Sequence, residues 1–102
     1  MSTTIEDAIS TVRVPIASLA PEPFELTEQI HAVVQPTEGG YTATFFDANI
    51  NTSGDTQEEA IRNLKSLICE LYEDLERESI ETLGPEPLRQ LEVLRTILKR
   101  NR

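Results

Sequence analysis

Three kinds of side chain in this sequence could take part in chemistry: one histidine, one cysteine and a short run of carboxylates. His31 lies in a stretch with strand-like alternation, and local spacing places no Ser or Cys beside it. We therefore expect a solvent-facing or hydrogen-bonded strand position rather than a general base. Cys69 has no second cysteine to pair with and no companion metal ligands, so we expect a small, semi-buried apolar residue. The sequence predicts no catalytic residue and no enzyme.

Glu70, Glu73 and Asp74 form an acidic run with i, i+3 and i+4 spacing on one flank of a predicted helix. This spacing could present carboxylates to a divalent ion or to a basic partner. Such a run can equally be a solvated face, and Arg62 and Lys65 on the same helix dilute its charge. We take the run as a candidate partner-binding site and predict neither a metal nor a cofactor.

The charge balance restricts the class of partner. Eighteen Asp and Glu residues against nine Lys and Arg residues give a net charge of −9. This argues against direct nucleic-acid binding, which depends on Lys and Arg neutralising phosphates. It favours a basic protein partner, unless the excess acid serves only solubility. No apolar run has the length of a membrane span and the N-terminus lacks a secretory signal, so a cytoplasmic protein without membrane contact is expected.

These residues are positioned by a long amphipathic helix predicted over residues 56–77. Gly54 allows a sharp turn, and Thr56 and Glu59 have the spacing of a capping box, in which Thr56 accepts from the Glu59 N–H and Glu59 accepts from the Thr56 N–H. One apolar stripe follows the three-four spacing of a helix. It comprises Ala60, Ile61, Leu64, Leu67, Ile68, Leu71, Tyr72 and Leu75.

Strand patterns precede this helix. Residues 28–35 and 41–47, joined by a Gly-rich loop, predict an antiparallel hairpin, and residues 48–53 predict a short third strand. Gly84 and two prolines mark the start of a second helix with a leucine stripe, which we expect to continue into the basic C-terminal residues. The expected fold class is α+β: a small three-stranded antiparallel sheet covered by one long helix, plus a C-terminal helix.

Three parts of the chain follow from these patterns. Residues 1–23 are an N-terminal arm, which could be helical through Ile5, Ala8, Ile9 and Val12. It could also pack on a neighbouring subunit as an extended segment around Pro15, or be a partly disordered tail. Residues 24–77 form the β-β-β-α core, and residues 78–102 form a connection and the C-terminal helix. A chain of 102 residues has limited apolar surface for its own core, so a homo-oligomer, dimer or tetramer, is expected.

The sequence around the helix start resembles the HicB-like antitoxin family. The family pattern is a glycine-aromatic strand followed by a helix start with Gly-Asp-Thr, Glu-Ala and Asn. The matching residues are Gly40, Tyr41, Gly54, Asp55, Thr56, Glu59, Ala60 and Asn63. The resemblance covers residues 24–77, and residues 83–94 resemble the C-terminal helix of short members of the family.

This resemblance implies a partial ribonuclease H-like β-β-β-α fold without catalytic residues. It also implies an antitoxin that binds and blocks a small basic HicA-like ribonuclease, as in a toxin–antitoxin system. The chain departs from full-length HicB proteins because residues after Leu83 supply one helix and no helix-turn-helix or ribbon-helix-helix module. The connection at residues 47–51 also lacks the proline and apolar residues common there. An orphan HicB-like module that binds copies of itself is the alternative.

Overall fold

The long amphipathic stretch forms α2 (Gln57–Arg77) in the structure, a computed structural model that describes residues 11–100. Thr56 caps the helix, and its hydroxyl oxygen accepts a hydrogen bond of 3.0 Å from the Glu59 N–H. The second half of the expected capping box differs. The Glu59 carboxylate accepts from the N–H of Asp55, at 2.7 Å, rather than from that of Thr56. The carboxylate therefore reaches one residue further back and ties the preceding turn to the helix.

Four strands form the main sheet, in the order β1-β3-β4-β5. They are β1 (Val12–Ile16), β3 (Ile30–Thr37), β4 (Gly40–Phe45) and β5 (Ile50–Gly54), and each neighbouring pair is antiparallel. The prediction of three strands was wrong by one strand. The missing strand is β1, which lies at an edge of the sheet, where a proline such as Pro15 is tolerated.

Part of the expected N-terminal arm therefore belongs to the folded body. Residues 12–16 pair with β3 of the same chain, in a register that sets Val14 opposite Ala32 and Ile16 opposite Ile30. Both partners in the second pair are buried. The helical alternative for the arm concerns residues that lie outside the described range, apart from Val12.

A second, two-stranded sheet was not expected. β2 (Phe24–Leu26) pairs antiparallel with β6 (Leu98–Arg100), which follows α3 (Pro85–Ile97) directly. The Arg100 guanidinium lies over the Phe24 ring, 4.8 Å from its centre. The rings of Phe24 and of Tyr72 in α2 pack edge to face, with 5.4 Å between their centres. The second helix thus ends at Ile97, because the following residues turn extended and pair with β2 instead of continuing the helix.

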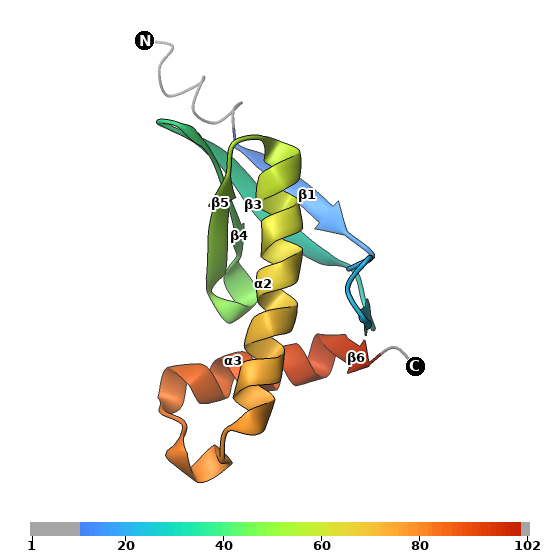
Figure 1. Ribbon diagram of the computed structural model, residues 1–102, viewed down its shortest axis with the longest axis vertical. Coiled ribbons are helices and arrows are strands. Elements are labelled where there is room, and N and C mark those ends of the chain that lie inside the picture. The colour runs from blue at the N-terminus through green and yellow to red at the C-terminus, as the bar shows by residue number, and fades with distance from the viewer. Residues whose placement is uncertain (1–10, 101–102) are drawn as a thin grey trace.

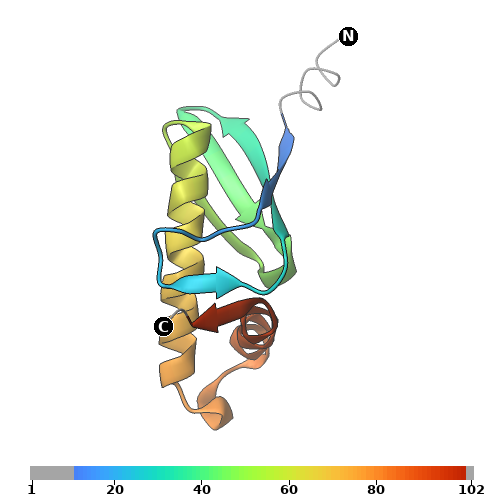
Figure 2. The same cartoon turned by 90° about the vertical axis from the view of Figure 1, so that its right-hand side faces the viewer.

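One face of the main sheet packs against α2, and Figure 2 shows no described element on the other face. Alternation along β4 explains this arrangement, because Ala43 and Phe45 point into the core while Thr42 and Thr44 are only half-buried. The α2 stripe completes the core through Ala60, Leu64, Ile68 and Leu75, with Cys69 beside it. The expected α+β arrangement of an antiparallel sheet covered by a long helix is confirmed.

Helix α3 crosses below the sheet and packs against the C-terminal half of α2 (Figure 1). Its buried residues are Leu91, Leu94 and Ile97. Short 3₁₀ turns, η1 (Phe46–Ala48) and η2 (Ile80–Thr82), link β4 to β5 and α2 to α3. Within residues 11–100, neither helix combines the length and the apolar character required to cross a membrane.

Candidate interaction surface

The residues of the HicB-like motif come together where the sheet passes into α2. Tyr41 pairs with Gly54 across β4 and β5, and Gly40 lies beside this pair. A Cβ atom at Gly54 would lie 2.5 Å from the backbone nitrogen of Ala60, so only glycine lets the helix approach the strand this closely. The motif thus positions the start of α2.

Two further residues of the motif have the same structural effect. The side-chain amide of Asn63 donates to the backbone oxygen of Ser53 at 2.8 Å, which ties the second turn of α2 to the end of β5. Ala60 is completely buried at the helix–sheet contact. Together with the Thr56 cap and the Glu59–Asp55 contact, these interactions account for the motif as a junction that fixes the helix on the sheet.

The acidic run is divided among separate contacts. Asp74 pairs with Arg77 of the same helix at 2.8 Å, and Glu73 pairs with Arg100 of β6 at 3.8 Å. Glu70 is exposed. Within the described part of the chain, no group of three or more His, Cys, Asp or Glu side chains could hold a metal ion. The run is therefore a partly neutralised surface that helps to hold the C-terminal strand.

His31 and Cys69 lie in opposite environments. His31 is exposed on β3, opposite Pro15, which is the solvent-facing strand position that was one of the two expected environments. Cys69 is 2% exposed, and burial, together with the nearby carboxylates of Glu22, Glu73 and Glu70, raises the pKa of its thiol to about 12. A thiol with such a pKa stays protonated at neutral pH and is a poor nucleophile.

A surface that the sequence patterns did not single out is centred on Phe46 in η1. This side chain is 64% exposed, although the preceding Phe45 is buried. A depression of about 270 Å³ lies on the uncovered sheet face, where Phe46 meets His31 and Val33. A second, more open depression of about 530 Å³ lies between Phe46 and α3. The ring therefore stands between two hollows.

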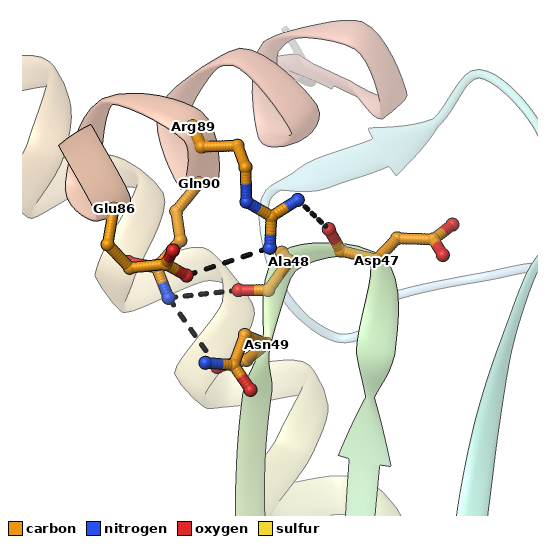
Figure 3. Close-up of polar contacts among 6 residues, drawn as sticks. All are labelled: Asp47, Ala48, Asn49, Glu86, Arg89 and Gln90. Atoms are coloured by element: carbon orange, nitrogen blue, oxygen red, sulfur yellow. Dashed lines mark hydrogen bonds and ion pairs between the residues drawn. The ribbon is translucent and has the colours of Figure 1, made fainter.

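Helix α3 holds the η1 turn in place (Figure 3). The Arg89 guanidinium donates to the backbone oxygen of Asp47 at 3.0 Å, and the Gln90 amide donates to the backbone oxygen of Ala48 at 2.9 Å. A longer contact of 3.5 Å joins the same amide to the Asn49 oxygen. Asn49 has a φ of 55°, a left-handed conformation that asparagine tolerates better than most residues. The exposure of Phe46 is thus imposed by a fixed turn.

Charged groups of both signs lie around Phe46. Arg13 lines the depression on the uncovered sheet face, and Arg89 lines the one beside α3. Glu28 and Asp47 line both depressions, and neither forms an ion pair within residues 11–100. Figure 3 shows the Asp47 carboxylate pointing away from α3. Arg89 is already engaged, since it pairs with Glu86 at 3.6 Å and binds the Asp47 oxygen.

No family model, curated protein or solved structure matches the chain. The function must therefore be inferred from the residues and their arrangement. An exposed aromatic ring between two hollows, with unpaired carboxylates beside it, is suited to binding another protein.

Proposed function

We propose that this chain is a non-catalytic, cytoplasmic HicB-like protein of the antitoxin type, which binds and neutralises a small basic HicA-like ribonuclease. The observation that carries the proposal is the Phe46 surface. Its aromatic side chain is exposed on the η1 turn, which α3 holds through hydrogen bonds, and unpaired carboxylates lie beside it. Aromatic residues, phenylalanine among them, are enriched in protein–protein interfaces relative to the rest of the protein surface.

The junction motif supports the family part of this proposal. Of the residues on which the resemblance rests, Gly54 and Asn63 hold α2 against β5, and Thr56 caps the helix. Gly40 allows the close approach of β4 to the end of β5. A partial ribonuclease H-like fold is compatible with consecutive antiparallel strands followed by a covering helix. The class of partner, a HicA-like ribonuclease, is proposed from the resemblance, and the net negative charge of this chain indicates that the partner is basic.

Charge complementarity supports a basic partner. The net charge of −9 would speed encounter with a basic protein, while apolar contacts would hold the complex. Four of the basic side chains, Arg77, Arg89, Arg95 and Arg100, are already paired with carboxylates of this chain. They are therefore less available to bind phosphates, which favours protein over nucleic acid as the partner.

Co-expression tests this function. The chain is expressed with a HicA-like ribonuclease encoded beside it, and growth, RNA integrity and co-purification are measured. We expect growth to recover and a stable complex to form, with faster association at low salt than at high salt. A ribonuclease mutated at its catalytic histidine serves as the control for binding without toxicity. Continued growth arrest with both proteins soluble and unbound would refute the antitoxin function.

The second candidate function is an orphan HicB-like module that forms a dimer or tetramer without a toxin. The observation that favours it is the sheet face left uncovered by any described element, together with the edge position of β5. Light scattering at increasing protein concentration separates a monomer from an oligomer. A complex with the ribonuclease that contains one copy of this chain would exclude this alternative.

A further inference from the structure

We propose that a basic segment of a partner protein docks at Phe46, placing an apolar side chain in the hollow between Phe46 and α3 and Lys or Arg side chains beside Glu28 and Asp47. The inference rests on the proposed function in that it names the surface used by the basic partner. It is argued from the shape, charge and rigidity of the described surface.

Shape distinguishes Phe46 from the other exposed apolar residues. Val12, Phe46 and Ile80 are the large apolar residues of the described chain that are well exposed, at 37%, 64% and 50%. Phe46 is the aromatic one, and it borders two hollows, so a partner side chain could contact more than one side of its ring. Ile80 lies in η2, away from both hollows.

The hollow beside α3 is lined by both apolar and charged side chains. Val93 and Ile97 contribute apolar surface, and Thr96 and Arg89 lie on the same helix. Its volume of about 530 Å³ lies within the range of about 300–1,000 Å³ that is usual for small ligand sites. An apolar side chain of a partner could therefore contact Phe46, Val93 and Ile97 at once.

Charge determines which partner fits. In the hollow beside α3, Glu28 and Asp47 present carboxylates that make no ion pair within residues 11–100. Arg89 of this hollow is held by Glu86 and by the Asp47 oxygen, and Arg13 lines the other hollow and not this one. A partner with Lys or Arg beside its apolar side chain would complement this arrangement. A second copy of this chain fits less well, because two molecules with a net charge of −9 repel each other.

Rigidity lowers the cost of binding. The contacts of Arg89 and Gln90 fix the backbone on both sides of Ala48, which is itself completely buried. The backbone of the turn that carries Phe46 therefore does not have to be ordered by the partner, and less conformational entropy is lost on association. The acidic run at Glu73 and Asp74 lacks this advantage, because a partner would have to compete with Arg100 and Arg77.

The contact is tested with synthetic peptides and the full chain. The probe is a short fluorescent peptide of Lys, Arg and Leu, compared with one peptide in which Ser replaces Leu and another in which Glu replaces Lys and Arg. Anisotropy measures affinity, and amide chemical shifts locate the site. We expect only the first peptide to bind appreciably, with shifts at Phe46, Asp47 and Val93.

Variants make the test specific. Phe46→Ala should weaken binding of the first peptide about tenfold or more, as expected for an aromatic hot spot. Glu28→Lys should weaken it less and reduce its salt dependence. Ile80→Ala and Glu70→Lys are the matched controls at exposed sites and should leave affinity unchanged. Thermal melting verifies that every variant is folded.

Several outcomes would overturn the inference: no binding of the first peptide, shifts confined to residues 70–74, or equal affinity for Phe46→Ala and the unmodified chain. Self-association that is abolished by Phe46→Ala would assign the surface to a second copy instead. The proposed function is judged separately. Failure to bind the ribonuclease, with peptide binding at Phe46 intact, refutes only the antitoxin function, whereas neutralisation by Phe46→Ala as efficient as that by the unmodified chain refutes only the Phe46 contact.

Discussion

The backbone oxygen of Gly54 lies 2.3 Å from the position that a Cβ atom at Gly40 would take. Gly40 and Gly54 belong to the neighbouring strands β4 and β5, so the backbone must move to make room. We expect Gly40→Ala to lower the free energy of unfolding by about 1–3 kcal/mol, the usual cost of overpacking. Chemical denaturation measures this loss.

Gly39 provides the matched control, because a Cβ atom there would meet nothing within 4 Å and its φ is not positive. Gly39→Ala should leave stability unchanged or raise it by about 0.4–1 kcal/mol, since the unfolded chain loses freedom. Equal effects of the two substitutions would mean that the strands are free to separate at this point.

Residues of the apolar stripe on α2 should contribute unequally to the free energy of unfolding. Leu64 is completely buried under the sheet, whereas Leu67 is only half-buried. We expect Leu64→Ala to cost about 2–5 kcal/mol of unfolding free energy through lost apolar contact and a cavity, and Leu67→Ala distinctly less. Urea titration of both variants makes the comparison. A larger loss for Leu67→Ala would place the helix in a different rotation on the sheet.

Gln90 should control the mobility of the η1 turn. Replacing it with Ala removes the donor to the Ala48 and Asn49 oxygens and should cost about 0.5–1.5 kcal/mol. Amide hydrogen exchange of residues 46–49 should become faster. Glu92→Ala, on the exposed side of α3, is the control and should leave this exchange unchanged. Unaltered exchange in Gln90→Ala would mean that Arg89 alone holds the turn.

Cys69 should make folding stability depend on alkaline pH. Burial raises the pKa of its thiol from 9.0 to about 12, so between these values the folded state retains a proton that the unfolded state has lost. The unfolded state then binds fewer protons, and stability falls as pH rises from about 9 towards 12, by at most about 1.4 kcal/mol per pH unit.

Melting temperatures at pH 8 to 11 would measure this effect, with Cys69→Ala as the reference. The reference is needed because Tyr72 also has a raised pKa, caused by burial and then by Glu76, and contributes a fall of the same sign. The chain with Cys69 should lose stability more steeply than Cys69→Ala. Parallel curves would show that solvent reaches the thiol in the folded state.

The sequence predicted those elements whose signals are local. Thr56 and Glu59 are close enough in the chain for their cap to be inferred directly, and the glycines between β3 and β4 indicated the hairpin. The edge strand β1 was missed because five residues that include Pro15 give little periodicity, and its pairing partner lies beyond two prolines and β2. Strand β6 was missed because Leu98 continues the helical spacing of the preceding leucines.

The Phe46 surface was beyond sequence reasoning for a related reason. The exposure of Phe46 follows from the η1 turn, and the donors that fix this turn lie in α3, about forty positions away in the chain. By contrast, the acidic run was visible in the sequence, while the arginine of β6 that pairs with it was expected in a helix. The properties of both candidate sites, the Phe46 surface and the acidic run, therefore depend on contacts between residues far apart in the chain.

The pairing of β2 with β6 encloses most of the described chain, all of it but residues 11–23 with β1, within a single loop. Closing so large a loop is entropically slower than forming the hairpin or α2, so these two short strands should meet last during folding. Three residue pairs hold them, and the Arg100–Phe24 contact adds to these pairs. We expect the β2–β6 sheet to be the first part of the structure to unfold locally. Its separation would expose the Phe24 ring while the main sheet remains intact.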